Sequence, residues 1–282
     1  MASIKELLSQ TSLEKVDARI LMTHLISQQL GWSKSALISR DQENLSPEFV
    51  SSWQAFEQRR LNGEPVAYIV GTKGFYNIDL HVAPGVLIPR PETELLVECS
   101  IQYLESLNKG SLEKSQVLDL GTGSGAIALA IAKNTKNTFV TAVDMSADAL
   151  KIARQNAQQL GLSDRVSFLQ GSWFEPLNKD DRFDLIVSNP PYIRQADPHL
   201  TEGDLRFEPI DALTDHYDGL NPYRTIFKES PSFLKPGGLL MVEHGYDQSE
   251  QLSQLLKNAG FIDIQIHFDL AGIARALSAK LG

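Results

Sequence analysis

This sequence of 282 residues has one cysteine, no long apolar run and fewer basic than acidic residues. The single cysteine, Cys99, excludes an internal disulfide and any zinc site built from several cysteines. Apolar runs such as Leu185-Ile186-Val187 are far shorter than the roughly 20 residues that a membrane span needs. The residues after Met1 also lack the basic and then apolar pattern of a signal peptide. We therefore expect a cytoplasmic protein without a membrane partner.

The charge balance is acidic. Lys and Arg total 26 against 35 Asp and Glu, which gives a formal net charge of -9. That field would repel a nucleic-acid backbone unless basic residues gathered on one face. The densest basic pair, Arg59-Arg60, is predicted at the end of a helix, where cations interact favourably with the helix dipole. We therefore expect no direct nucleic-acid binding and, because the six histidines form no close cluster, no metal site.

Residues 1–75 have a helical pattern. Thr11-Ser12 is a candidate N-cap, and Ser46-Pro47 offers a second N-cap with a first-turn proline. Gly63 would end the helix that begins at Ser46-Pro47. An apolar stripe at helical spacing follows the first cap: Leu13, Val16, Ile20, Leu21 and Leu25. We predict a small helical domain over these residues.

Helical and strand-like segments alternate from residue 92 to the end of the chain. Strands are predicted near 117–120, 139–143, 166–169, 183–187 and 239–242, followed by two closing strands. This alternation predicts an α/β domain with a doubly wound, mostly parallel sheet of seven strands and helices on both faces. Between the two domains, residues 76–91 are predicted to form a hairpin and a proline-bounded linker.

A glycine-rich loop and an acidic residue follow the first two predicted strands. The loop is Asp119-Leu120-Gly121-Thr122-Gly123-Ser124-Gly125, whose glycines allow a sharp turn and a close approach to a ligand. Asp144 is placed to accept hydrogen bonds from ribose hydroxyls at the same sheet edge. Dinucleotide-binding and adenosylmethionine-binding folds share this pair of features. Asp119 would compete with a pyrophosphate but attract an ammonium, which favours S-adenosyl-L-methionine.

An aromatic residue follows the third strand at this edge. In Gly171-Ser172-Trp173-Phe174, the Trp173 ring could cover an adenine or could simply pack against the core.

The fourth strand, 183–187, leads into Asn189-Pro190-Pro191-Tyr192. An amide nitrogen is a poor nucleophile, but the Asn189 side-chain oxygen and the Pro190 carbonyl could accept both of its N–H bonds. The prolines would fix these acceptors before a substrate arrives, and Tyr192 could lie against the planar group. A sulfonium methyl is already a good electrophile, so in-line approach is the main task that remains. We therefore predict methyl transfer to a planar nitrogen.

The Asn-Pro-Pro-Tyr sequence resembles the motif of methyltransferases that modify planar exocyclic or amide nitrogens. The whole chain is similar to the HemK/PrmC family, the protein-(glutamine-N5) methyltransferases. The similar segments are 59–65, 68–71, 87–94, 121–125, 186–193, 207–209, 243–245 and 269–272. The family methylates the glutamine of the Gly-Gly-Gln motif in class-1 peptide-chain release factors. The resemblance therefore implies this activity, with release factors as protein partners that the helical domain helps to dock.

The resemblance also implies roles for individual residues. Binding of S-adenosyl-L-methionine is implied for Gly121, Thr122, Gly123, Ser124, Gly125, Asp144, Trp173 and Asn189. Substrate binding is implied for Asn189, Pro190, Pro191 and Tyr192, of which Asn189, Pro190 and Tyr192 are the expected catalytic residues. Arg90 and Glu94, which lie within or follow the proline-bounded linker segment, could either orient the two domains or border the cleft.

Two other functions compete with this hypothesis. A nucleic-acid exocyclic-amine N-methyltransferase could use the same four-residue motif, although the acidic balance disfavours it. A non-catalytic adenosylmethionine-binding module could keep the fold without turnover. The presence of the glycine loop, the ribose acid and the Asn-Pro-Pro-Tyr motif together favours an enzyme.

Overall fold

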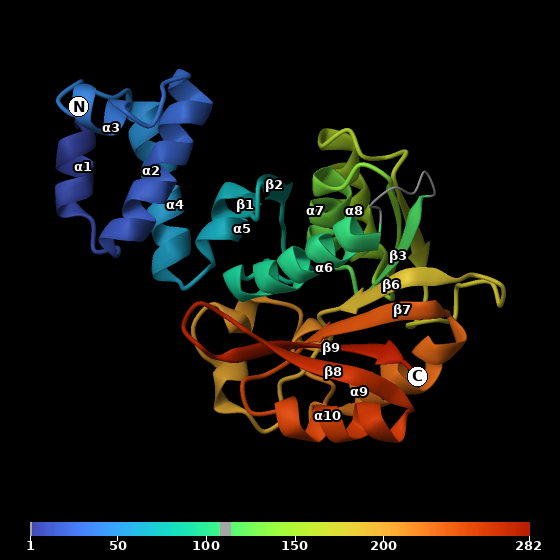
Figure 1. The fold of residues 1–282 in the computed structure, drawn as a ribbon. Helices are drawn as coiled ribbons and strands as arrows, with labels where there is room; N and C mark the ends of the chain where they lie inside the picture. The colour runs from blue at the N-terminus through green and yellow to red at the C-terminus, as the bar shows by residue number, and fades with distance from the viewer. Residues whose placement is uncertain (1, 108–113) are drawn as a thin grey trace. The chain divides into compact units, whose positions relative to one another are not determined.

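The computed structural model describes residues 2–107 and 114–282. The chain divides into two compact units, which are described separately (Figure 1). Unit 1 comprises Met1–Thr72 and Glu202–Phe207, and unit 2 comprises Lys73–Thr201 and Glu208–Gly282. Among the described residues, no helix has both the length and the apolar composition needed to cross a membrane.

Unit 1 is helical. Its helices are α1 (Ile4–Gln10), α2 (Lys15–Leu30), α3 (Ala36–Ser39), α4 (Pro47–Leu61) and α5 (Val66–Val70). Ser46 caps α4 by accepting a hydrogen bond from Phe49 N at 3.2 Å, as the Ser-Pro pattern predicts. At the other end of α4, Arg60 binds Asp17 at 2.7 Å and Asp204 at 2.8 Å. Arg60 is thus a structural cation within unit 1.

Two predictions for the first helices are wrong. Thr11 is the C-cap of α1, an element that the sequence pattern missed, and α2 has Glu14 as its N-cap. Val16 and Ile20 are 69% and 45% exposed, so they do not belong to the buried stripe. The helical repeat places them opposite the face that packs in the core. That buried face consists of Ala18, Leu21, Met22, Leu25 and Ile26.

Unit 2 contains a two-stranded sheet and a seven-stranded sheet. The small sheet pairs β1 (Thr72–Phe75) with β2 (Ile78–His81). The large sheet has the order β5-β4-β3-β6-β7-β9-β8 and is parallel except at β9, which runs antiparallel to both of its neighbours. Its strands are β3 (Ser115–Leu120), β4 (Thr138–Asp144), β5 (Val166–Gln170), β6 (Phe183–Ser188), β7 (Leu234–Glu243), β8 (Phe261–Phe268) and β9 (Ala274–Leu281). The predicted α/β fold with a mostly parallel seven-stranded sheet is confirmed.

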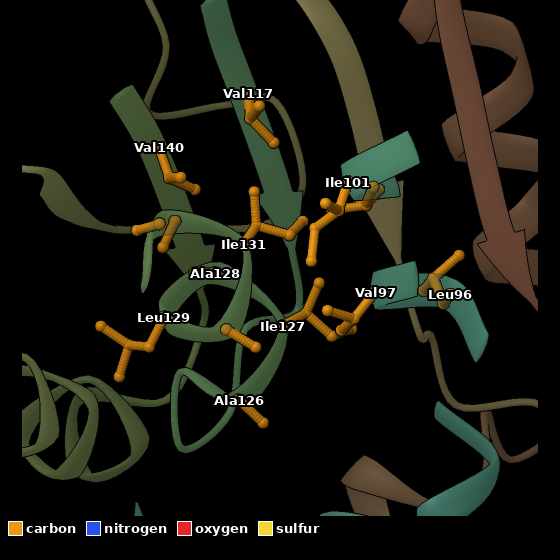
Figure 2. Close-up of a cluster of buried hydrophobic side chains, with 14 of the residues drawn as sticks. Leu96, Val97, Ile101, Val117, Ala126, Ile127, Ala128, Leu129, Ile131 and Val140 are labelled. Carbon is orange, nitrogen blue, oxygen red and sulfur yellow. The ribbon is translucent and has the colours of Figure 1, made fainter. Parts of the chain in front are cut away.

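Helices cover both faces of this sheet. They are α6 (Glu94–Leu107), α7 (Ala126–Asn134), α8 (Ala147–Gln159), α9 (Asn221–Glu229) and α10 (Ser249–Asn258). Alternate strand residues belong to different cores: Val117 packs with residues of α6 and α7, and Leu118 with residues of α9 and α10. Figure 2 shows side chains of α6 and α7 meeting Val117 and Val140 in the first core. Two-sided burial explains why these strands are nearly continuous apolar runs.

The strand register brings the predicted functional segments to one edge. Leu120 of β3 lies opposite Val143 of β4 on one side and Ser188 of β6 on the other. Because the three strands are parallel, the segments that follow them leave the sheet at the same edge. The glycine loop, Asp144 and Asn189 therefore come together although they are far apart in the sequence.

Candidate active site

A cavity of about 400 Å³ lies at this edge, within unit 2. Eight of the predicted site residues line it: Gly121, Thr122, Gly123, Ser124, Asp144, Trp173, Asn189 and Pro191. Gly125, Pro190 and Tyr192 are not among the lining residues. The structure therefore gathers most of the predicted set around one space.

Asp119 stabilises the glycine loop through hydrogen bonds. Its buried carboxylate accepts hydrogen bonds from Thr122 Oγ1 at 2.6 Å and from Ala128 N at 3.2 Å. Burial raises the pKa of Asp119 to about 7. The residue does not line the cavity. Its hydrogen bonds to Thr122 and Ala128 stabilise the turn that follows β3.

Gly125 is required by packing. It has φ 85° and precedes α7, and an added Cβ would lie only 2.9 Å from Leu129 Cδ1 and 3.3 Å from Ala153 Cβ. A side chain there would be strained at this positive φ and would crowd Leu129 of α7 itself and Ala153 of α8. This contact explains a glycine at a position that does not line the cavity.

Asp144 joins the loop to the end of β4. Its Oδ2 accepts a hydrogen bond from Gly123 N and its Oδ1 one from Ser146 N, both at 2.8 Å. Burial raises the pKa of this carboxyl, and the backbone hydrogen bonds oppose that shift. Each oxygen keeps a second lone pair that could accept a ligand hydroxyl.

Trp173 lies over the glycine loop. Its ring atom Cζ3 is 4.0 Å from the position that a Cβ on Gly121 would occupy. The residue has a φ of 48°, an uncommon conformation for a large side chain. The ring also packs against the second core. It therefore serves as a wall of the cavity and as part of the core at once.

The Asn-Pro-Pro-Tyr segment begins directly after β6. Ser188 donates to Leu120 O at 2.8 Å, and Asn189 Nδ2 donates to Thr93 Oγ1 at 3.0 Å. Because the amide nitrogen is held by Thr93, the Asn189 oxygen is left to accept from another group. The Tyr192 hydroxyl points away to Glu243, with 3.4 Å between Tyr192 Oη and Glu243 Oε1. Burial raises the pKa of Tyr192, so the phenol stays neutral.

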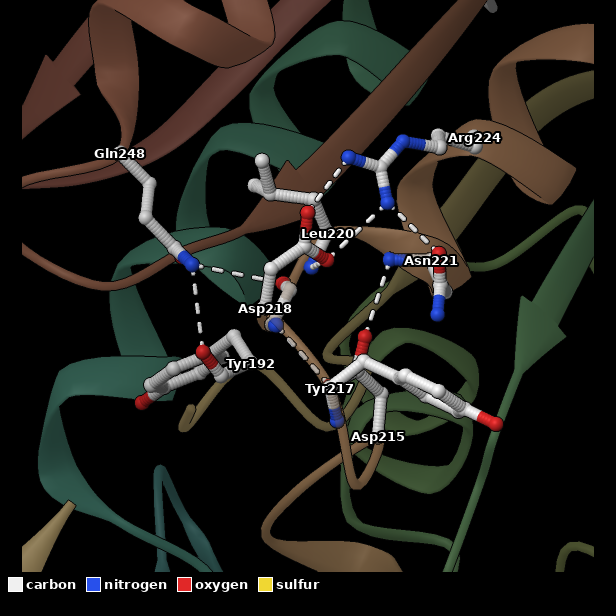
Figure 3. Close-up of polar contacts among 9 residues, drawn as sticks. Tyr192, Asp215, Tyr217, Asp218, Leu220, Asn221, Arg224 and Gln248 are labelled. Atoms are coloured by element: carbon white, nitrogen blue, oxygen red, sulfur yellow. Dashed lines mark hydrogen bonds and ion pairs between the residues drawn. The ribbon is translucent and has the colours of Figure 1, made fainter. Parts of the chain in front are cut away.

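The backbone after Tyr192 is held by a second group of polar contacts. Gln248 Nε2 donates to Tyr192 O at 3.1 Å and to Gly219 O at 3.3 Å (Figure 3). Gly219 comes so close that an added Cβ would lie 2.3 Å from Tyr192 O. Asp215 closes this loop by accepting hydrogen bonds from three backbone N–H groups, of Tyr217, Gly219 and Asn221. The motif is thus fixed at both ends before any ligand binds.

The linker and a distant loop form the remaining walls. Arg90 lines the cavity from the end of the linker and Thr93 from the short 3-10 helix Pro91–Thr93, whereas Pro209, Asp211 and Ala212 line it from the loop after β6. Glu208, whose carboxylate is fully buried, forms an ion pair with Arg90 and accepts a hydrogen bond from Ile88 N at 2.9 Å. Arg90 thus lies at the border of the cavity, which is one of the two possibilities that the sequence left open for it.

Glu94 has a different place. Its Oε1 accepts a hydrogen bond from Tyr76 N at 2.8 Å, and the residue does not line the cavity. The sequence pattern drew attention to Arg90 and Glu94 but not to Thr93, which lies between them and lines the cavity. Pro209 belongs to a segment that resembles the family, but no local pattern placed it or Asp211 and Ala212 at the cavity, because only the fold brings them there.

The lining suits a cofactor without phosphate. Among the described residues, the lining contains two carboxylates, of Asp144 and of Asp211, whose Oδ1 lies 2.6 Å from His216 Nε2, and one cation, Arg90, which is paired with Glu208. A pyrophosphate would find repulsion and no free basic partner, whereas a sulfonium or ammonium would find favourable charge. Apolar lining by Ile127 and Val143 suits an aromatic base. Across residues 2–107 and 114–282, no group of three or more His, Cys, Asp or Glu side chains could hold a metal ion.

The sheet and its glycine loop define a methyltransferase domain. The sequence model described as "Methyltransferase domain" matches residues 111–269. Among solved structures, the T. thermophilus 16S rRNA N2 G1207 methyltransferase RsmC, in complex with AdoMet and guanosine, has a TM-score of 0.54. The match covers 75% of this chain and 50% of that chain at 21% identity, and shows a shared fold.

Full-length relatives narrow the class to one family. The release factor glutamine methyltransferase of Burkholderia pseudomallei is 45% identical over 284 residues, or 99% of this chain and 96% of the relative. That of Bordetella pertussis is 45% identical over 275 residues, or 98% of each chain. A model described as "PrmC N-terminal domain" matches residues 1–71. The chain belongs to the release factor glutamine methyltransferase family, which confirms the predicted resemblance.

Proposed function

We propose that this protein transfers a methyl group from S-adenosyl-L-methionine to the side-chain nitrogen N5 of the glutamine in the Gly-Gly-Gln motif of peptide-chain release factors. The observation that carries the proposal is the Asn189 amide, held through its nitrogen by Thr93 at the wall of an acidic cavity. Family membership supports the choice of protein substrate. Translation takes place in the cytoplasm, so the proposed reaction belongs there.

The cavity would hold the cofactor through three groups. Asp144 would accept hydrogen bonds from the ribose hydroxyls, the loop Gly121–Ser124 would approach the cofactor closely, and Trp173 would cover the adenine. When bound, S-adenosyl-L-methionine supplies an electrophilic methyl group on a positively charged sulfur. The carboxylate of Asp144 makes the cavity favourable for that charge.

The Asn-Pro-Pro-Tyr segment would hold the substrate amide. The Asn189 oxygen and the Pro190 carbonyl would accept the two N–H bonds of the glutamine, which directs the nitrogen lone pair at the methyl group. Pro191 keeps these acceptors in place, and the ring of Tyr192 would limit movement of the planar amide. Preorganised acceptors of this kind cost no rearrangement during the reaction.

A nucleic-acid substrate has weaker support. The chain has a formal net charge of -9, and the relatives that match it over nearly its full length are release factor enzymes. The 21% identical rRNA enzyme shares the fold, which many substrates can use.

Transfer of labelled methyl groups tests the proposal. The enzyme is incubated with labelled S-adenosyl-L-methionine and one of three acceptors: a release factor, the same factor with its Gly-Gly-Gln glutamine replaced by alanine, or total RNA. We expect label in the first acceptor alone. Label in RNA, or equal label in both release-factor proteins, would contradict the proposed substrate.

A further inference from the structure

Three exposed apolar side chains of unit 2 lie on loops beside the Asn-Pro-Pro-Tyr segment. Tyr217 is 71% exposed, Tyr246 is 74% exposed and Leu270 is fully exposed. Single exposed apolar residues are common on protein surfaces and need no explanation. These three differ because each is held on an ordered loop, and the three loops are connected to one another around the segment.

The loop that carries Tyr217 is bonded to the residues that follow the motif. Gln195 N donates to Tyr217 O at 3.1 Å, and Ile193 N donates to Leu213 O at 3.0 Å. Asp215 accepts hydrogen bonds from three backbone N–H groups of the same loop. Figure 3 shows the Tyr217 ring pointing away from these contacts. The backbone is therefore fixed while the ring remains exposed.

The loop that carries Tyr246 follows β7 and is joined to the motif by the two residues after Tyr246. Asp247 pairs with Arg194 at 3.0 Å, and Gln248 Nε2 donates to Tyr192 O at 3.1 Å. Gln248 Nε2 also donates to the backbone oxygen of residue 219 in the Tyr217 loop, at 3.3 Å. These contacts place both tyrosine-bearing loops against the end of the motif.

Leu270 occupies the turn between β8 and β9. Asp269 Oδ1 accepts from two backbone N–H groups of this turn at 2.9 Å each, and its Oδ2 accepts from Arg275 Nε at 2.9 Å. The Arg275 backbone oxygen accepts from His244 N at 2.9 Å, which connects the turn to the Tyr246 loop. Because β9 begins at the turn and runs antiparallel to β7, the turn lies at the edge where β6 and β7 end (Figure 1).

A Gly-Gly-Gln motif offers few groups for recognition. Its glycines have no side chains, and the glutamine amide is the reacting group. Ordering glycines also costs more conformational entropy than ordering other residues. Much of the affinity must therefore come from the substrate surface around the motif. Tyrosine rings suit such contacts, because they supply a large contact area at a low entropy cost.

The charges beside these loops favour a protein partner over a nucleic acid. Three arginines there are each paired with an aspartate: Arg194 with Asp247, Arg224 with Asp218, and Arg275 with Asp269. A phosphate backbone would have to compete with these carboxylates for the cations. A protein surface with apolar groups can cover the loops while the pairs stay intact.

We propose that Tyr217, Tyr246 and Leu270 form a docking surface for the part of the release factor that surrounds its Gly-Gly-Gln motif. This inference rests on the proposed function, in which the glutamine of that motif accepts the methyl group. None of the three residues lines the cavity among the described residues. They should therefore contribute to binding of the substrate protein and not to the methyl-transfer step.

The first test measures the kinetics of Tyr217→Ala, Tyr246→Ala and Leu270→Ala with an intact release factor. Each variant should raise KM about fivefold and leave kcat near the wild-type value, because the contact is lost and the reacting groups are unchanged. Ile262→Ala is the matched control: Ile262 is 52% exposed on β8 and pairs with Lys280, at the opposite end of that strand from the turn. A residue whose variant matches the control is not part of the surface, and the proposal fails if all three match.

The second test needs no turnover, and it separates this inference from the proposed function. A release factor with its Gly-Gly-Gln glutamine replaced by alanine is added to the wild-type protein, and amide hydrogen exchange is measured. Residues 214–219, 244–248 and 269–273 should become protected. Protection of other segments alone would overturn the docking surface. So would protection of these loops by an RNA oligonucleotide or by self-association of the free protein, without protection by the release factor. A wild-type protein that transfers no methyl group to an intact release factor would instead refute the proposed function.

Discussion

At the scale of single residues, the site depends on how side chains are held before ligands bind. The side-chain nitrogen of Asn189 donates a hydrogen bond to Thr93 Oγ1. Each carboxylate oxygen of Asp144 accepts one hydrogen bond from a backbone N–H group. Both side chains therefore present an acceptor in a fixed direction. Asn189 would matter most while the substrate nitrogen reacts, whereas Asp144 would matter for cofactor affinity.

Asn189→Ala should fold and bind cofactor but lose most of its turnover. A single preorganised group of this kind is worth about 10²–10³ in rate, or about 2.7–4 kcal/mol. Asn189→Asp keeps an acceptor but adds negative charge that could also stabilise the ground state, so we expect intermediate activity. Single-turnover rates and cofactor titrations separate chemistry from binding, with the exposed Asn178→Ala as control. Wild-type rates in Asn189→Ala would rule out the proposed acceptor.

Asp144→Ala should weaken cofactor binding by about 1.5–3 kcal/mol, because the ribose hydroxyls lose a charged acceptor. The same change also frees Gly123 N and Ser146 N, so the loop itself should loosen. Calorimetric titration measures the affinity. Asp148→Ala, an exposed acid at the start of α8, is the control. Unchanged affinity in a folded Asp144→Ala protein would remove this residue from the site.

At the scale of elements, the two irregular segments that complete the cavity are joined to each other. Arg90 of the linker pairs with the buried Glu208 of the loop after β6, and Glu208 also accepts from Ile88 N. Neither segment is a regular strand or helix of the large sheet. This ion pair therefore gives the cavity wall a stability that secondary structure does not supply.

Arg90→Ala should lower the free energy of unfolding by about 2–3 kcal/mol, because it leaves a buried carboxylate without its cation. Arg90→Ala combined with Glu208→Gln should recover part of the loss. The control is Arg194→Ala, whose partner Asp247 is exposed, and a pair of that kind contributes little. Denaturation midpoints and methylation rates give the readouts. If Arg90→Ala changes neither quantity, the pair has no structural or catalytic role.

The sequence predicts some of these elements and contacts and misses others. The strands were predictable because burial on both faces makes them short apolar runs, and the glycine loop and Asn189 follow two of them directly. Helix α1 was missed, and the buried face of α2 was misassigned, because its exposed residues Val16 and Ile20 are as apolar as core residues. Thr93, Glu208 and Glu243 act through contacts between segments distant in sequence. The family resemblance covers the segments in which these three residues lie, but no local pattern shows which residues they contact.

At the scale of the whole molecule, charge and topology favour a particular kind of partner. The formal net charge of -9 disfavours a polyanionic substrate, and the cavity adds carboxylates where a phosphate would need cations. Six residues of the long loop, Glu202–Phe207, belong to unit 1 while the residues before and after them belong to unit 2. Each unit is therefore built from one segment that begins before the Asn-Pro-Pro-Tyr motif and one that follows it.

Locating the transferred methyl group tests the proposed reaction most directly. A release factor is incubated with S-adenosyl-L-methionine and either the wild-type protein or Asn189→Ala, and its Gly-Gly-Gln peptide is then fragmented in a mass spectrometer. We expect one added methyl group on the side-chain nitrogen of the glutamine with wild-type protein, and very little with Asn189→Ala at the same time point. A methyl group on another atom or residue, or an unmodified glutamine beside methylated nucleic acid, would contradict the proposed reaction.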